Sequence, residues 1–469
     1  MQNNPKRILF PITNIAFAIR QLNWAKAIES ETSWDPIIFS VVNEKDLKKI
    51  CDEKKIQCSC PIIYSTPDKG GRLIDILNFI IYNLSKIPFS NFISLPFTIY
   101  RHILIFKTKI SQARMFMKTH HINVMMLPDS SPVYSAPILS FAARKEKVLV
   151  LTNPLDRDSP KGYAMIYKTD VTLGAKCWSV GWVTSRVFSK WLKVYSNTRI
   201  LRIPPPEIFA HELLGIASPK PWNTFGFIED FVIVGNEIQK IFYHKTGIKN
   251  EKIIVIGTPE QDNLSSLLKN YSEYEKVTHS EISFNNNKPI ILCALPQAHW
   301  VSGRPEAEFQ NHEEMINAWV KSLTSQNNYN IIFSLHPSMP FSNFKHLESS
   351  SIKVAQKDIV NFIPICSIFV ACLSSTIPLA IALGKPVINY DVYRYSFEIE
   401  EYLYKEAFGT VTVHNQIDFN SIIKRITTDI GYYNTMKKKQ NEISKKWGVI
   451  DGQSSNRLNN FLNSILNLN

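Results

Sequence analysis

The chain has 469 residues, a length that favours two domains of roughly 200 to 250 residues each. Hydrophobic residues make up 45% of it and charged residues 20%, which excludes disorder as its main state. The 53 Lys and Arg outnumber the 40 Asp and Glu, so the net charge is +13. This excess points to an anionic partner such as a phosphate, a nucleotide, a nucleic acid or an acidic lipid.

The seven cysteines form no CxxC pair and no zinc-ligand spacing with histidine. We therefore expect no disulfide scaffold, no metal site and no cofactor. No run of about 18 apolar residues could span a bilayer, and the first residues contain no apolar run of signal-peptide length. These observations favour a cytoplasmic protein, for which attachment to a membrane surface stays open.

The first elements in chain order are strands that alternate with helices. Apolar runs at 7–12, 34–42 and 57–64 are typical of strands, and helical patterns cover 16–28 and 44–55 between them. This alternation predicts an α/β fold with a parallel sheet.

A segment without acidic residues follows, over 76–128. It contains six cations and many aromatic and aliphatic residues. We predict a helical insertion near 76–118 whose apolar side chains enter a lipid boundary while its cations meet anionic headgroups. The alternative is a buried helix pair with a solvated basic edge.

The next strands, at 121–128 and 147–152, flank a helix at 136–145. Asp129 opens the loop after the first of these strands, and Asp156 and Asp158 lie in the loop after the second. Ligands of open parallel sheets bind beyond the carboxyl ends of the strands. Both loops are therefore candidate parts of an active site.

The pattern continues and then repeats after a polar stretch. Strands at 231–234 and 252–256 end the first half, and a new strand begins at 289. We predict an N-terminal domain over 1–268, an irregular linker over 269–288, a C-terminal nucleotide-donor domain over 289–440, and helices over 441–469 that return to the N-terminal domain.

Two polar motifs follow strands of the second half. His336 and Pro337 come directly after the strand at 330–335, and Ser374, Ser375 and Thr376 lead from the strand at 368–371 into a helix. We expect these motifs to end neighbouring strands, where hydroxyl groups and free N–H groups at the helix start would bind phosphate. The alternatives are a turn with a structural histidine and an ordinary helix cap.

The order of these motifs resembles a known group of enzymes. The His-Pro motif lies 38 residues before Ser374, Gly384-Lys385-Pro386 follows, and DGQSSNR at 451–457 resembles the family's closing helix. This order resembles bacterial GT-B enzymes of surface-polysaccharide assembly: sialyltransferase-like enzymes, capsule Kdo transferases and CDP-glycerol glycerophosphotransferases. The resemblance implies a GT-B fold, which consists of two Rossmann-like domains facing a central cleft.

The resemblance also implies roles for the candidate residues. The sialyltransferase-like families take the acceptor proton with an acidic residue of an Asp/Glu-Asp/Glu-Gly motif, which this sequence lacks. We therefore choose the base by its position after a strand: Asp129 is our first choice, although it is also suited to an Asx-type cap on the next helix, and Asp156 and Asp158 are the alternatives. The residues expected to bind the donor are His336, Pro337, Ser374, Ser375, Thr376, and Gln297 and His299 in the loop after the strand at 289–295, which is also compatible with an ordinary turn.

The function that we expect is metal-independent transfer of a sugar, a nonulosonic or Kdo-like acid, from a CMP donor to a glycan or glycolipid acceptor. The enzyme would lie in the cytoplasm or on the inner face of the cytoplasmic membrane, with an anionic membrane surface as a further partner. The alternatives are phosphoglycerol transfer from CDP-glycerol, sugar transfer from UDP, a nucleotide-sugar epimerase and a non-catalytic scaffold. Nucleic acid is not an expected partner, because the basic residues accompany aliphatic residues and no nucleic-acid-binding module is recognisable.

Overall fold

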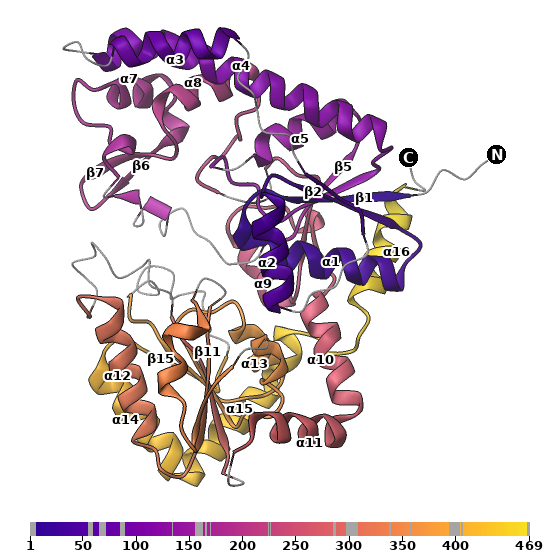
Figure 1. The fold of residues 1–469 in the computed structure, drawn as a ribbon, viewed down its shortest axis with the longest axis vertical. Coiled ribbons are helices and arrows are strands. Elements are labelled where there is room, and N and C mark those ends of the chain that lie inside the picture. The colour runs from indigo at the N-terminus through magenta and orange to yellow at the C-terminus, as the bar shows by residue number, and fades with distance from the viewer. Residues whose placement is uncertain are drawn as a thin grey trace. The chain divides into compact units, whose positions relative to one another are not determined.

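The protein is described from a computed structural model, in which the chain divides into two compact units (Figure 1). Unit 1 comprises Met1–Val234, Lys240–Ile254 and Asn459–Asn469, and unit 2 comprises Gly235–Gln239 and Val255–Leu458. The structure describes residues 6–54, 60–64, 72–84, 90–133, 135–154, 163–164, 167–168, 170–223, 225, 227–284, 288–296, 308–336, 339–355, 358–393, 404 and 407–466.

Unit 1 is built on a seven-stranded sheet with the order β3-β2-β1-β4-β5-β8-β9. Its registered strand pairs are parallel. Strands such as β4 are buried along their whole length, as expected where helices cover both faces of a sheet. The strands are β1 (Arg7–Ile12), β2 (Asp35–Ser40), β3 (Ile62–Tyr64), β4 (Val124–Leu127), β5 (Leu149–Thr152), β8 (Phe231–Val234) and β9 (Ile253–Val255).

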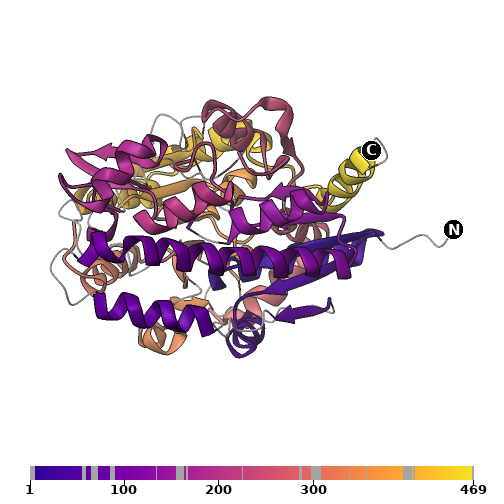
Figure 2. The same ribbon diagram turned by 90° about the horizontal axis from the view of Figure 1, so that it is seen from above.

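The helices of unit 1 include the predicted insertion, which consists of α3 (Arg72–Leu84) and α4 (Ser90–Thr119). In the two views, α3 lies beside α4 along one side of the unit (Figure 2). The others are α1 (Ala18–Glu31), α2 (Glu44–Lys54), α5 (Ala136–Lys145), α7 (Val180–Val187), α8 (Pro205–Leu214) and α9 (Glu237–Lys245), and a small hairpin joins β6 (Leu192–Tyr195) to β7 (Thr198–Leu201).

Unit 2 has a six-stranded parallel sheet with the order β12-β11-β10-β13-β14-β15. Two apolar clusters pack on it, one containing Trp319 stacked on Tyr390 and the other containing Trp447. The strands are β10 (Ile290–Ala294), β11 (Asn330–Ser334), β12 (Ile352–Ala355), β13 (Ile368–Ala371), β14 (Val387–Tyr390) and β15 (Thr410–Val413), and the α-helices are α10 (Pro259–Lys269), α11 (Tyr271–Ile282), α12 (His312–Thr324), α13 (Ile377–Ala382), α14 (Gln416–Thr428), α15 (Ile430–Trp447) and α16 (Ser454–Leu466).

The predicted α/β class with two Rossmann-like parallel sheets is confirmed. The stretch 269–288 differs from the irregular linker that we expected, because most of it is helix α11. Its sequence looked polar, yet Tyr274 and Ile282 pack against a core cluster of unit 2. At the chain end, Asn463 accepts a hydrogen bond from Lys6 and Phe461 packs on Phe231, so the end of α16 belongs to unit 1.

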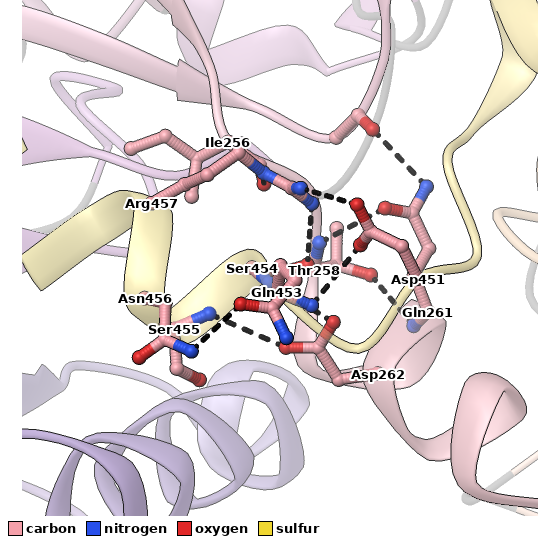
Figure 3. A network of polar contacts seen from close by, with 11 residues as sticks. Ile256, Thr258, Gln261, Asp262, Asp451, Gln453, Ser454, Ser455, Asn456 and Arg457 are labelled. Carbon is pink, nitrogen blue, oxygen red and sulfur yellow. Dashed lines mark hydrogen bonds and ion pairs between the residues drawn. The ribbon is translucent and has the colours of Figure 1, made fainter. Parts of the chain in front are cut away.

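A polar network in unit 2 fixes the start of α16 (Figure 3). The buried carboxylate of Asp262 accepts hydrogen bonds from the backbone N–H of Ser454 at 3.0 Å and of Ser455 at 3.3 Å. Arg457 donates to the carbonyl of Ile256 at 2.6 Å and to Asp451 at 2.7 Å. Asp262 thus supplies the acceptors that the first N–H groups of a helix need.

Replacing Asp262 by Asn should lower the free energy of unfolding by about 2 kcal/mol, because bonds to a buried charged acceptor contribute about that much. The matched control is Asp451→Asn, which weakens a partly exposed ion pair and should cost less than about 1 kcal/mol. Urea unfolding of the full chain measures both. Equal losses in the two variants would contradict the role given to Asp262.

Candidate active site

Each sheet has a point where the strand order reverses, and ligands of such sheets bind there. In unit 2 this point lies between β10 and β13, and in unit 1 it lies between β1 and β4. The segment leaving β13 contains Ser374, Ser375 and Thr376, and the segment leaving β4 begins with Pro128 and Asp129. Two of the predicted polar segments therefore lie at these reversal points.

The turn after β13 has a defined and unusual backbone. Leu373 has a φ of 47°, a left-handed conformation that a branched residue rarely adopts. Its N–H donates a hydrogen bond of 2.8 Å to Oδ1 of Asn389, a fully buried residue of β14, whose Nδ2 donates to Thr412 Oγ1 at 3.3 Å. The neighbouring strand thus holds the turn in place, and such strain is common at functional sites.

The hydroxyl groups of this turn are its main polar feature. Ser374 Oγ lies 2.8 Å from Thr376 Oγ1 and also accepts a 3.3 Å hydrogen bond from the Thr376 N–H. Ser375 is exposed. Helix α13 is only six residues long, and the N–H of Ile377 already donates to the Ser374 carbonyl. The N–H groups of Thr376 and Ile377 are thus engaged within the turn, and phosphate binding by the turn stays a prediction.

His336 follows β11 and is half-buried, and its carbonyl accepts a 2.8 Å hydrogen bond from the Met339 N–H. The expectation that His336 and the Ser374 turn end neighbouring strands is wrong, because β10 lies between β11 and β13. Two strand spacings correspond to about 10 Å. A ligand that contacts both motifs must therefore extend across the end of β10.

Three of the predicted donor-binding residues, Gln297, His299 and Pro337, lie outside the described residues. The described segments on either side of 297–307 are firmly held. The Pro296 carbonyl lies 2.9 Å from His312 Nε2, and Glu308 accepts hydrogen bonds from the Tyr390 hydroxyl at 2.6 Å and the Gln416 N–H at 2.7 Å. Burial, reinforced by the Glu308 hydrogen bond, raises the pKa of Tyr390, so its hydroxyl stays a donor at neutral pH.

Sequence reasoning missed two further residues at this sheet edge, Asp391 after β14 and His414 after β15. Asp391 is fully buried, and its Oδ2 lies 3.6 Å from Nδ1 of His414. Each follows a strand, which is the signal that singled out His336. Burial and then the charge of Asp391 raise the pKa of the Cys372 thiol well above its usual value, which favours the neutral thiol.

In unit 1, Asp129 is buried and forms an Asx-type turn with Ser131, but it does not cap the next helix, because Ser135 occupies the N-cap position of α5. One carboxylate oxygen accepts a hydrogen bond from the Ser131 N–H. The next hydroxyl, Ser130 Oγ, donates to buried Glu229 at 3.2 Å. The carboxylate thus lies at the reversal point of the sheet in a fixed orientation, which a general base also requires.

Arg202 is a second unit 1 residue that the sequence did not reveal. It is 1% exposed, and its Nη2 donates to Ser131 Oγ at 3.0 Å. Its guanidinium carbon lies 3.9 Å from the ring centre of Tyr163 and 5.7 Å from that of Trp222. In the described part of the chain no acceptor reaches its Nε or Nη1. Arg202 thus adds a buried positive charge near Asp129, stabilised by aromatic faces.

The alternative bases Asp156 and Asp158 lie outside the described residues. Within the described ranges no cluster of three or more His, Cys, Asp or Glu side chains could hold a metal ion. Metal independence stays a prediction.

A family model matches residues 225–464, which are 240 of the 469 residues. Its description is CDP-Glycerol:Poly(glycerophosphate) glycerophosphotransferase. The chain belongs to this family. Residues 225–464 include the whole sheet of unit 2 and therefore His336, the Ser374 turn, Asp391 and His414. This glycerophosphotransferase-family chain has no match among curated proteins.

Solved structures resemble the chain in fold over nearly its whole length. The S. aureus MnaA–UDP co-structure has a TM-score of 0.54 and 14% identity, covering 99% of this chain and 98% of that chain. UDP-GlcNAc 2-epimerase from Neisseria meningitidis bound to UDP-GlcNAc has a TM-score of 0.52 and 14% identity, covering 98% of this chain and 100% of that chain. The wall teichoic acid polymerase TagF soaked with CDPG has a TM-score of 0.52 and 12% identity, covering 99% of this chain and 89% of that chain. At identities this low, the likeness shows that the chain shares the fold of these proteins and shows nothing about its activity.

Asn389→Ala should weaken nucleotide binding about tenfold, because the Leu373 N–H loses the acceptor that holds the turn. Thr412→Val is the control, since it removes the other partner of Asn389 and leaves the bond to Leu373. Calorimetric titration with CDP-glycerol compares the two variants. A normal affinity of the folded Asn389→Ala protein would show that the turn does not contact the nucleotide.

Proposed function

We propose that this enzyme transfers glycerol phosphate from CDP-glycerol to a hydroxyl group of a glycan, glycolipid or glycerophosphate polymer. The observation that carries the proposal is the family match over 225–464, the half of the chain that contains the predicted donor site. The net charge of +13 suits an anionic donor and an anionic acceptor.

This proposal replaces the CMP-linked acid donor that we expected first. The family description names CDP-glycerol, which was one of the alternatives from the sequence. A UDP-sugar transferase or epimerase has less support, because the likeness to UDP-GlcNAc 2-epimerases at 13–14% identity shows only a fold, which TagF at 12% identity shares. The general class, a transferase of polysaccharide assembly, is unaffected by the choice of donor.

In the proposed reaction, the acceptor hydroxyl oxygen attacks the phosphorus that carries glycerol. A P–O bond to the acceptor forms, and the P–O bond to the CMP part breaks. CMP leaves with the electron pair of the broken bond, so negative charge grows on its phosphate, while the acceptor proton passes to a base. Catalysis of this step requires positioned donors for the charge and a base for the proton.

We assign His336, Ser374 and Ser375 to the leaving CMP, since an imidazole and hydroxyl groups can donate hydrogen bonds to its phosphate. We assign the proton to Asp129, with Asp156 and Asp158 as alternatives. The assignments in the two units are independent of each other and are tested separately.

A panel of donors tests the substrate. The purified enzyme should release CMP from CDP-glycerol in the presence of a glycerophosphate oligomer, and CDP-glycerol should raise its melting temperature more than CMP-sialic acid or UDP-GlcNAc does. Stabilisation and turnover with a CMP-linked acid alone would restore our first expectation. A rise in melting temperature with CDP-glycerol, but no release of CMP with any acceptor, would favour the non-catalytic scaffold.

Two substitutions separate the assigned roles. Asp129→Asn should keep the affinity for CDP-glycerol and lose most of the transfer rate, because an amide cannot take the proton. His336→Ala should weaken donor binding and lower turnover about 10- to 1000-fold, with little effect on the melting temperature. Full activity of either variant removes that residue from the site, and a loss seen only in Asp156→Asn or Asp158→Asn moves the base to that loop.

A further inference from the structure

Arg202 carries buried hydrogen-bond donors for which the described part of the chain supplies no acceptor. It follows β7 and is 1% exposed, and its Nη2 donates to Ser131 Oγ at 3.0 Å. Its Nε and Nη1, which carry most of the N–H groups of a guanidinium, have no acceptor among the described residues. A buried donor without an acceptor costs free energy, so a ligand with oxygen atoms would relieve that cost here.

The aromatic rings around Arg202 do not replace such a ligand. Its guanidinium carbon lies within 6 Å of the ring centres of Tyr163, Tyr167 and Trp222, at 3.9, 5.1 and 5.7 Å. An aromatic face attracts the positive charge but is a weak hydrogen-bond acceptor. Trp222 is fixed by its own hydrogen bond, from Nε1 to the Trp191 carbonyl at 2.8 Å. Tyr163 and Tyr167 are only half-buried, so the guanidinium lies directly beneath rings that reach the surface.

Asn153, at the end of β5, is a second buried side chain with an unused donor. It is 2% exposed, and its backbone N–H donates to the Leu127 carbonyl at 2.9 Å, which places it next to the end of β4. Its Oδ1 accepts a hydrogen bond from Arg20 of α1. Because arginine can only donate, this bond fixes the orientation of the amide, and Nδ2 has no acceptor among the described residues. Arg202 and Asn153 thus both offer N–H groups beside the segment 127–131.

Ser131 connects Arg202 to the candidate base. Its backbone N–H donates to the Asp129 carboxylate, and its hydroxyl accepts the hydrogen bond from Arg202. The carboxylate and the guanidinium are therefore separated by a single serine. A ligand that occupies the guanidinium lies close to the place where the acceptor hydroxyl must meet Asp129.

The position of these residues in the chain favours the acceptor over the donor as this ligand. Arg202 and Asn153 lie outside the residues 225–464 that the family model matches, whereas the candidate donor-binding residues lie inside them. The net charge of +13 suits an anionic acceptor. Attachment to an anionic membrane surface stays a prediction from the sequence, and no helix in the described part of the chain is long and apolar enough to cross a membrane.

We propose that Arg202, together with Asn153, binds a phosphate group of the acceptor and so selects acceptors that carry a phosphate near the reacting hydroxyl. Arginine binds phosphate through paired, charge-assisted hydrogen bonds, which suits its unused donors. In a terminal glycerol phosphate unit, a three-carbon chain separates the phosphate from the free hydroxyl. A phosphate at Arg202 therefore presents that hydroxyl to Asp129, and this part of the inference rests on the proposed function.

Calorimetric titration with sn-glycerol 3-phosphate tests the phosphate site without a donor. The full chain should bind this probe, and Arg202→Lys should lower the affinity about tenfold or more, because lysine keeps the charge but cannot form the paired bonds. Asn153→Asp keeps an acceptor for Arg20 and adds a negative charge, so it should weaken binding by a similar factor.

Steady-state kinetics test the selection of the acceptor. With CDP-glycerol as donor, Arg202→Lys should raise KM for a glycerophosphate oligomer about tenfold or more and leave KM for CDP-glycerol unchanged. The matched control is Arg199→Lys. Arg199 is a half-buried residue of β7 that donates to Ser185 Oγ at 3.4 Å, and its variant should bind and react like the wild type.

Melting temperatures establish which variants are folded; Arg202→Lys decides the outcome, or Asn153→Asp if Arg202→Lys does not fold. The inference is overturned if the wild type does not bind sn-glycerol 3-phosphate or if the deciding variant binds it normally. It is also overturned if that variant weakens CDP-glycerol binding instead, which would place a donor phosphate at Arg202. Loss of probe binding in an enzyme that never turns over CDP-glycerol supports the phosphate site and contradicts only the proposed function.

Discussion

Parallel strands end at one edge of their sheet, and this constraint determines where polar groups can gather in each unit. Central strands such as β4 and β13 are buried on both faces, so they contribute aliphatic packing and almost no chemistry. The residues just beyond them are free to be polar. In unit 2 these are His336, the Ser374 turn, Asp391 and His414, and in unit 1 they include Asp129. The candidate chemistry of the protein thus follows from the direction of its strands.

Buried polar groups in both units must find partners, because an unpaired one costs free energy. Asn389 does so by holding the strained turn at Leu373, and Asp262 does so by capping α16. Arg202 is stabilised partly by aromatic faces and partly by Ser131. Each of these residues contacts, and thereby positions, a segment that is distant in the sequence.

The local pattern of the sequence was sufficient to predict the strands and the polar residues that follow them. Buried apolar runs predicted most of the strands, and the residues after them included Asp129, His336 and the Ser374 turn. The order of strands in space is not a local property, so the presence of β10 between His336 and the turn was missed. The hydrogen bond between Leu373 and Asn389 joins residues far apart in the sequence, and so do the contacts around Arg202. No motif spacing in the sequence predicts such contacts. The motifs indicated a nucleotide donor, but they did not determine which group it carries.

The proposed formation of a phosphodiester from CDP-glycerol is tested most directly by ³¹P NMR of the reaction mixture. With CDP-glycerol and a glycerophosphate oligomer, we expect a phosphodiester signal to grow in step with CMP while the diphosphate signal of the donor declines. Asp129→Asn should produce neither change at the wild-type rate. CMP that appears without a new phosphodiester, or transfer that occurs only with a CMP-linked acid or a UDP-sugar, would contradict the claim.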